Sequence, residues 1–318
     1  MQAEVNQNTI VFFENQYVPL AEARVSILTH ALHYGTGNFD GIRGYWDDKQ
    51  RELFLVRPQD HYVRWKTNCG ILRIDVPLSA GELSEITAEL IRRNQFQSNV
   101  YVRPLAYKSA QRIGVIPDDR DAFALMVVPF GDYLDSRQGL HAGVVSWRRV
   151  EDNAIPGRAK ICGAYVNSAL ASDEARRNGF DEAIFLNESG HVAEGATCNI
   201  FLVRNGKLIT PPGTENILEG ITRACVMELA RRELNLDVVE RPVDRSELYV
   251  CDEVFFTGTA VEVAPVVQVD HRPVKTGAVG PVSRQLRRLY FEATRGYLAH
   301  YHDWLMRVYH PATVGKAA

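Results

Sequence analysis

The sequence has few cysteines, few lysines and no long hydrophobic run. Its five cysteines are widely spaced and form no CxxC pair, which argues against a disulfide framework and against a zinc site. The longest apolar runs, such as residues 123–130, are far too short to span a bilayer, and the N-terminus lacks the pattern of a secretion signal. We therefore expect a cytoplasmic protein that binds no metal and no membrane.

Neither positive nor negative charge predominates in the sequence. The 36 basic and 39 acidic residues are mixed along the chain and give a net charge of −3. Because nucleic-acid binding needs a basic patch, we expect no nucleic-acid partner. What remains is an ordinary globular composition, 46% hydrophobic and 24% charged, in 318 residues, a length that favours two domains.

The pattern of apolar residues predicts strands and helices in both halves of the chain. A turn-rich segment, residues 131–137, separates them and is the expected linker between an N-terminal domain, 1–130, and a C-terminal domain, 138–318. In the first half we expect strands at 9–13, 17–20, 39–46, 52–56, 101–107 and 123–130, and a helix that opens with the capping box at 79–82. In the second half we expect strands at 143–150, 182–186 and 199–204, and helices at 165–177, 221–233 and 282–298.

One of the seven lysines stands out. Lys160 lies in a run of small and apolar residues between a predicted strand and a predicted helix, which indicates desolvation of its amine. A desolvated lysine has a lowered pKa, and its neutral amine can attack a carbonyl to form a Schiff base. A lysine at a helix start whose amine reaches solvent would have the same local sequence.

Two other segments have the character of anion sites, and a third holds an isolated carboxylate. Residues 218–223 place a glycine and a hydroxyl at a helix start, which suits a phosphate but is equally typical of a plain helix cap. The turn 257–260 follows a strand and can form a second anion-binding concavity, although many such turns bind nothing. Glu194 lies among small residues before an apolar strand, either buried with a cationic partner or in a solvated turn.

Taken with other segments in the same order and spacing, these motifs carry a specific resemblance that covers nearly the whole chain. The segments are 30–36, 39–43, 61–64, 101–104, the run around Lys160, 172–179, 194–195, 220–223 and 257–262. Together they resemble fold-type IV aminotransferases that depend on pyridoxal 5′-phosphate, most closely the branched-chain amino acid aminotransferases. The resemblance implies an α+β fold, with a smaller N-terminal α/β domain and a larger C-terminal domain whose β-barrel-like core is flanked by helices.

The resemblance also implies a reaction. Such an enzyme moves the amino group of leucine, isoleucine or valine to 2-oxoglutarate in two half-reactions, a ping-pong scheme. Lys160 matches the lysine that carries the cofactor as an internal aldimine and acts as the base. Glu194 matches the carboxylate that pairs with the pyridine nitrogen, and Tyr165 matches the tyrosine near the phenolic oxygen. The positions that match phosphate-binding residues are Arg64, Ile221, Thr222 and Thr259.

Substrate positions follow from the same comparison. The amides around Thr259 and Ala260, with Tyr101, match the receptor of the substrate α-carboxylate, and Phe39 matches a residue along the side-chain pocket. Arg103 matches the arginine that accepts the distal carboxylate of glutamate, and it alternates with Val102 so that it projects on the same side as Tyr101. Tyr34 and Val115 match residues supplied across a subunit interface, so a homodimer or higher homo-oligomer is implied.

Three segments depart from the branched-chain pattern, one of them the pair Gly37 and Asn38. Residues 161–164 replace two glycines and an asparagine, and the loop 108–117 keeps Gly114 and Val115 but loses the glycine-rich stretch before them. These differences bear on the substrate range. The alternatives within the family are therefore a D-amino acid or (R)-amine transaminase, a lyase acting on aminodeoxychorismate, or an enzyme with both L-amino acid and amine activity. A binder that keeps the fold without the reaction is the alternative of another class.

Overall fold

The computed structural model describes residues 6–131 and 138–310, which form two compact units. The first unit contains residues 6–131 together with 292–310, and the second contains residues 138–291. The expected linker, 131–137, lies outside the described residues except for Gly131. Residues 292–310, expected in the C-terminal domain, pack with the first unit in the structure.

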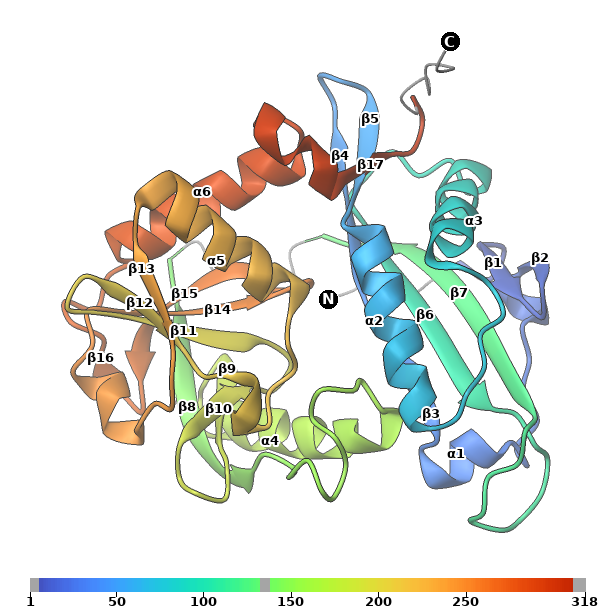
Figure 1. Ribbon diagram of the computed structural model, residues 1–318, viewed down its shortest axis with the longest axis horizontal. Coiled ribbons are helices and arrows are strands. Elements are labelled where there is room, and N and C mark those ends of the chain that lie inside the picture. The colour runs from blue at the N-terminus through green and yellow to red at the C-terminus, as the bar shows by residue number, and fades with distance from the viewer. Residues whose placement is uncertain (1–5, 132–137, 311–318) are drawn as a thin grey trace. The chain divides into compact units, whose positions relative to one another are not determined.

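The first unit is built on an eight-stranded sheet with the order β17-β5-β4-β6-β7-β1-β2, in which β3 also pairs with β6 (Figure 1). Its strands are β1 (Ile10–Phe13), β2 (Gln16–Pro19), β3 (Gly37–Phe39), β4 (Ile42–Asp47), β5 (Glu52–Val56), β6 (Val100–Lys108), β7 (Asp121–Pro129) and β17 (Leu305–Arg307). All their pairings are antiparallel, so the expected hairpins at 9–20 and 39–56 are confirmed.

The last strand explains why the C-terminal residues join the first unit. β17 pairs with β5, and the buried Glu52 carboxylate accepts backbone N–H groups from Val308, Tyr309 and His310. A carboxylate that accepts several N–H bonds is held ionised. Burial acts to raise the pKa of Glu52, but these N–H groups hold the pKa below its ordinary value.

Three helices complete the first unit: α1 (His30–Tyr34), α2 (Pro58–Ile71) and α3 (Ala80–Arg93). Ser79 and Glu82 form the expected capping box at the start of α3, whose Leu83, Leu90 and Ile91 are buried. α3 packs against α2, β1 and β7. The apolar side chains between the helices and the sheet form one core, to which Trp65 of α2 contributes.

The second unit contains a nine-stranded sheet with the order β10-β9-β8-β15-β14-β11-β12-β13, and β16 pairs with β15. Its strands are β8 (Leu140–Arg148), β9 (Glu182–Leu186), β10 (Val192–Gly195), β11 (Asn199–Arg204), β12 (Lys207–Thr210), β13 (Asp237–Glu240), β14 (Glu253–Gly258), β15 (Glu262–Val269) and β16 (Arg272–Pro273). β10 also contacts β11, so six strands curl around a shared apolar core. This curvature confirms the expected barrel-like core.

Helices flank that core, which confirms the α+β fold class. α4 (Tyr165–Arg177) packs against β8 and β9, and α5 (Ile221–Leu234) packs against β13 and β14. α6 (Pro281–Thr294) is shorter than the expected helix at 282–298. Short 3-10 helices are η1 (Leu20–Glu22), η2 (Cys162–Ala164), η3 (Gly213–Glu215), η4 (Arg245–Tyr249) and η5 (Ala299–Trp304). None of the helices in the described ranges has the length and apolar character needed to cross a bilayer.

Candidate active site

The lysine predicted to be catalytic lies shortly before the start of a helix. Lys160 precedes η2, and α4 begins directly afterwards at Tyr165. The Lys160 side chain is half-buried, and its Nζ donates a hydrogen bond of 2.8 Å to the Tyr165 hydroxyl. The structure therefore brings together the two residues that the sequence analysis assigns to the reacting end of the cofactor.

Glu194 is buried, so the alternative of a turn glutamate in solvent does not apply. Its Oε1 pairs with Nη2 of Arg149 at 2.9 Å, and its Oε2 accepts hydrogen bonds of 3.1 Å from both Asn199 Nδ2 and the backbone N–H of Leu218. Burial raises the pKa of Glu194, while Arg149, Leu218 and Lys160 act to lower it. Since a carboxylate has about four acceptor directions, three donors leave one on Oε1 for a further donor.

Arg149 and Asn199 are functional candidates that the sequence reasoning missed. Arg149 directly follows β8, and its guanidinium also donates to Ser168 and lies 5.4 Å from the Phe185 ring centroid. Nothing in its local sequence distinguishes it from other arginines. Asn199 carried a signal, because a polar side chain at the first position of an apolar, buried strand needs hydrogen-bond partners.

The start of α5 has unpaired backbone donors. Its N-cap is Gly220, and no side chain caps the helix, so the first N–H groups, including those of Ile221 and Thr222, have no partner within the helix. The positive end of the helix dipole lies at the same place. The Thr257 hydroxyl in β14 is buried without a hydrogen-bond partner among the described residues, and Thr259 and Ala260 follow in the next turn. These groups together suit an anion.

The predicted phosphate arginine of the first unit is held by a buried aspartate. Arg64 donates from Nε to Oδ2 of Asp40 at 3.0 Å and from Nη2 to Oδ1 at 2.7 Å. His61 Nδ1 lies 2.9 Å from the same Oδ1, which also accepts the Gly41 N–H. Burial acts to raise the pKa of Asp40, but the Arg64 charge and the His61 hydrogen bond hold it well below its ordinary value.

The structure also brings together the predicted substrate residues of the first unit. Tyr101 and Arg103 lie on the same side of β6, and Nη2 of Arg103 is 3.3 Å from the Tyr101 hydroxyl. The Arg103 guanidinium lies 4.4 Å from the centroid of the Phe39 ring. A Cβ at Gly41 would lie 1.9 Å from the Tyr101 hydroxyl, so only glycine permits this close approach. Arg103 is therefore half-buried over aromatic rings and is not a surface arginine.

Hydrogen bonds to backbone groups bring the segments that carry Tyr34 and Val115 together. The Tyr34 hydroxyl accepts the N–H of Gly114, and the carbonyl of Val115 lies 3.2 Å from His30 Nε2. Val115 is 69% exposed. Both residues thus lie on segments that present side chains to solvent.

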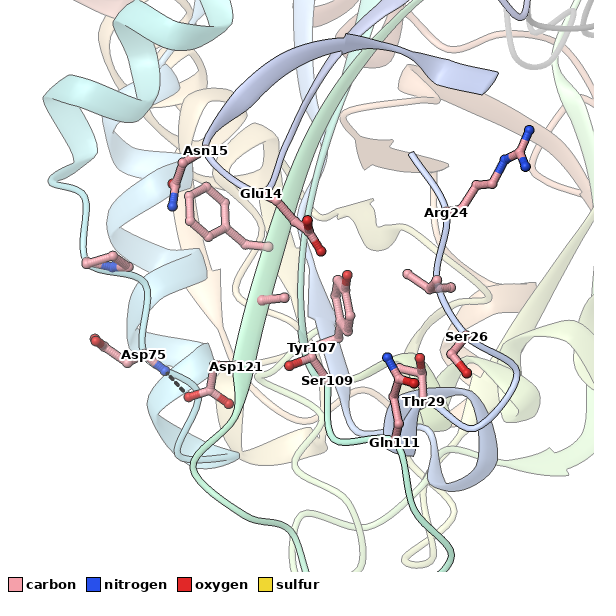
Figure 2. Close-up of a pocket in the computed structure, with 14 residues that line it drawn as sticks. Glu14, Asn15, Arg24, Ser26, Thr29, Asp75, Tyr107, Ser109, Gln111 and Asp121 are labelled. Carbon is pink, nitrogen blue, oxygen red and sulfur yellow. Dashed lines mark hydrogen bonds between the residues drawn. The ribbon is translucent and has the colours of Figure 1, made fainter. Parts of the chain in front are cut away.

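A pocket of about 400 Å³ in the first unit lies apart from all these residues (Figure 2). Glu14 and Tyr107 line it and point toward one another, and the Asp75 N–H donates to Asp121 at its edge. Burial, followed by the Glu14 charge, raises the pKa of Tyr107. None of the predicted site residues lines this pocket, so it is not the site that the sequence analysis describes. Among the described residues, no group of three or more His, Cys, Asp or Glu side chains is arranged for a metal.

Comparison with known proteins decides the family. The model of amino-transferase class IV matches residues 37–269. The chain belongs to the class IV aminotransferases. A class IV relative, a probable branched-chain-amino-acid aminotransferase of Aquifex aeolicus, is 49% identical over 299 residues, which cover 94% of this chain and 96% of the relative.

Solved structures of class IV aminotransferases agree over the same extent. The branched-chain aminotransferase of Thermoproteus uzoniensis with norvaline is 40% identical, with a TM-score of 0.90. The branched-chain amino acid aminotransferase of Thermobaculum terrenum in its PLP form is 38% identical, with a TM-score of 0.91. Each comparison covers 95% of this chain and 99% of the other. These relatives do not favour the D-amino acid, (R)-amine or relaxed-specificity alternatives.

As a class IV aminotransferase, the protein is an enzyme that uses pyridoxal 5′-phosphate to transfer amino groups. The described residues fit this cofactor. Glu194 has an acceptor direction for a ring N–H, Lys160 provides an amine, and the uncapped start of α5 suits a phosphate dianion. The buried, unpaired Thr257 hydroxyl is a further polar group that bound cofactor can satisfy.

Proposed function

We propose that the protein transfers the amino group of L-leucine, L-isoleucine or L-valine to 2-oxoglutarate by a ping-pong mechanism in which Lys160 is the catalytic residue. The observation that carries this proposal is the environment of Glu194. A buried carboxylate is held by Arg149, Asn199 and Leu218 and keeps one acceptor direction open, in the same unit as the lysine. The similarity to branched-chain aminotransferases over 94% of the chain supports the substrate class.

Lys160 is proposed to move the proton. The bound cofactor supplies a protonated ring that withdraws electrons from the substrate Cα. Lys160 Nζ takes the proton from Cα and delivers it to the carbon that becomes the amine carbon of the cofactor. The Tyr165 hydroxyl, 2.8 Å from Nζ, orients the amine for this transfer. The second half-reaction reverses these movements with 2-oxoglutarate.

Glu194 is proposed to accept the ring N–H and to stay ionised while doing so. Burial favours its protonated form, because desolvation raises its pKa. The Arg149 guanidinium at 2.9 Å and the Leu218 N–H oppose that effect. A protonated Glu194 could not hold a protonated ring nitrogen, so Arg149 contributes to catalysis through Glu194.

The remaining proposed roles divide between cofactor and substrate. Arg64, Ile221, Thr222 and Thr259 are proposed to bind the phosphate, for which a guanidinium fork and helix-start N–H groups are suited. The amides at Thr259 and Ala260, with Tyr101, are proposed to receive the α-carboxylate. Arg103 stacks on Phe39, which gives one region both an apolar face for leucine and a cation for glutamate.

We infer that the enzyme is a homodimer or a higher homo-oligomer, because the first unit exposes an apolar patch. Its members are each between 65% and 79% exposed: Ile27, Leu32, Ile113, Val115 and Ile116. A bridge between Thr29 and Gln111 joins the two segments that carry them. Exposed apolar groups at this density mark an interaction surface, and Tyr34 lies within it. Ile116→Asp is expected to shift sedimentation toward monomer, whereas Val250→Asp, at an exposed valine of the other unit, is not.

The setting proposed for the enzyme is the cytoplasm, with small amino acids and 2-oxo acids as its partners and neither nucleic acid nor membrane. The mixed charge of the chain supports this. Five cysteines that form no disulfide are in keeping with a reducing compartment.

The test is a visible absorption spectrum of the purified protein, recorded before and after L-leucine and again after 2-oxoglutarate. A cofactor band that fades with leucine and returns with 2-oxoglutarate is expected. Lys160→Ala should retain cofactor but lose turnover, and Lys207→Ala, at an exposed ion pair with Asp237, should behave as wild type. A band that leucine leaves unchanged would refute the proposed substrates, and ordinary turnover by Lys160→Ala would refute the role of the lysine.

A further inference from the structure

The side chain of Asn199 joins two parts of the second unit. Asn199 is buried at the start of β11, and its Nδ2 donates to Glu194 Oε2 at 3.1 Å and to the Leu218 carbonyl at 2.7 Å. Both of these groups only accept hydrogen bonds, so the amide must present its NH₂ to them. The Asn199 Oδ1 atom is consequently directed elsewhere, and its neighbour is Gly220.

Gly220 is the N-cap of α5 and is in close contact with that amide oxygen. A Cβ on Gly220 would lie 2.2 Å from Asn199 Oδ1. The backbone of Gly220, with φ −69° and ψ 138°, is one that any residue adopts. Space, and not backbone conformation, therefore requires glycine here. One amide thus contacts the Glu194 carboxylate, the Leu218 carbonyl in the turn before α5 and the Gly220 N-cap of α5.

We propose that Asn199 is a positioning residue that couples the two ends of the cofactor site, by aiming Glu194 at the ring nitrogen and by fixing the Leu218–Gly220 turn from which the α5 N–H groups meet the phosphate. This inference rests on the proposed function, because it assigns the ring end to Glu194 and the phosphate end to α5. It adds a physical link between the two ends.

The chemistry of the site explains why the link is an uncharged donor. The charges of Arg149 and Lys160 act to lower the pKa of Glu194. The carboxylates of Glu182 and Glu194 both act to raise the pKa of the Cys198 thiol. An aspartate in place of Asn199 would add a further carboxylate and bring two like charges together. An amide supplies two N–H donors without changing that balance of charge.

The first test measures the binding of pyridoxal 5′-phosphate and of pyridoxal, which lacks the phosphate, to the apoenzyme by absorption titration. In Asn199→Leu, a similar-sized side chain without donors, we expect about tenfold weaker binding of pyridoxal, the size of one lost bond to a charged group. The loss for pyridoxal 5′-phosphate should be larger, about a hundredfold, because the start of α5 is released as well. Equal losses for the two compounds, or none, would overturn the coupling.

The second test asks whether Gly220 acts through Asn199. Gly220→Ala should weaken pyridoxal 5′-phosphate binding about tenfold in the wild-type background, because its methyl group displaces the amide. In an Asn199→Ala background, where the displaced atoms are missing, the same substitution should change binding less than about twofold. Equal effects in both backgrounds would show that the methyl group acts on the helix directly. Gly81→Ala, where a Cβ meets nothing closer than 3.9 Å, is the matched control.

The third test uses the pH dependence of the leucine half-reaction in the holoenzyme. Loss of the Asn199 donor removes a bond that favours ionised Glu194, so the acid limb of the pH profile should move to higher pH by about one unit in Asn199→Leu. An equal loss of rate at every pH would indicate a structural role alone and would overturn the proposal. If wild-type apoenzyme fails to bind pyridoxal 5′-phosphate, the proposed function is wrong; if it binds and the variants match it, only this inference is wrong.

Discussion

Two buried carboxylates, one in each unit, are each paired with an arginine but differ in how completely they are bonded. Asp40 is contacted by four nitrogens, three of them on Oδ1 (Gly41 N–H, His61 Nδ1 and Arg64 Nη2) and one on Oδ2 (Arg64 Nε). Glu194 is contacted by one nitrogen each of Arg149, Asn199 and Leu218. Asp40 thus has one contact more than Glu194, and two of its four contacts come from a single guanidinium.

The pKa values of Asp40 and Glu194 are shifted in opposite directions. Burial acts to raise both, yet Asp40 is held well below its ordinary pKa while the pKa of Glu194 stays raised. A bidentate guanidinium stabilises a charge more than a single contact does. The donors around a buried carboxylate, and not burial alone, therefore set the direction of its pKa shift.

Glu194→Gln is the change with the largest expected effect and tests the functional side of the comparison. It keeps the size of the side chain but removes the charge that is proposed to hold the ring nitrogen protonated. We expect kcat for leucine to fall about a thousandfold, about 4 kcal/mol in the barrier. Stopped-flow absorbance measures the rate, and Glu188→Gln, at an exposed position of the same unit, is the control. Near-normal kcat would contradict the role.

Asp40→Asn tests the structural side. It leaves Arg64, whose side chain is 15% exposed, without its carboxylate, so we expect a loss of about 3 to 4 kcal/mol in the free energy of unfolding at pH 7, measured with urea. Because the folded pKa of Asp40 is lowered, its stabilisation is complete above the ordinary pKa and declines as the pH falls below about 4. The difference in the free energy of unfolding between Asp40→Asn and wild type should therefore become smaller in that pH range. Asp60→Asn, at an exposed ion pair with Arg57, should cost less than about 1 kcal/mol.

Glu182 extends this comparison, because within the described ranges its hydrogen bonds come from backbone groups alone, the N–H of Ala183 and of Ala196. Burial raises its pKa from 4.5 to about 7. The folded state therefore retains a proton that the unfolded chain releases, and stability falls as the pH rises through that interval. Glu182→Gln should gain up to about 3 kcal/mol relative to wild type between pH 4 and pH 8, measured by urea unfolding. A pH-independent difference would show that Glu182 titrates normally.

Tyr165→Phe has the smallest expected effect. It removes the hydroxyl that accepts the hydrogen bond of Lys160 Nζ but leaves Glu194 and its donors in place. We expect kcat for leucine to fall about fivefold, about 1 kcal/mol, with no change in the free energy of unfolding beyond about the same amount. A loss as large as that of Glu194→Gln would place the critical contact at Lys160 and not at the ring nitrogen.

Most elements could be predicted from sequence, but α2 could not, for a physical reason. Its buried side includes His61 and Asn68 beside Tyr62 and Trp65, so hydrophobic periodicity does not mark the inward face. β17 is only three residues long and is defined by its pairing with β5, about 250 residues earlier in the chain. Long-range pairing leaves no local pattern to read.

The candidate site likewise contains some residues that could be selected from sequence and others that could not. Lys160 and Glu194 could be selected from sequence because each is a charged residue among small or apolar neighbours. Arg149 is brought to Glu194 by the parallel pairing of β8 with β9, and the donation by the Leu218 N–H depends on a turn 24 residues away. Asp40 lay within a matched segment, but its contacts with Arg64 belong to the folded chain alone. The sequence pattern thus singles out the two proposed reacting groups, but not the residues that contact them.

The pairing of β17 with β5 also has a consequence for the order in which the protein is made. The buried Glu52 carboxylate finds its N–H donors at residues 308–310, which leave the ribosome only after residues 138–291. The sheet of the first unit therefore keeps one edge unpaired until β17 has been made, whereas residues 138–291 are contiguous and can fold before it. The unit whose synthesis begins earlier is thus the unit that is completed later.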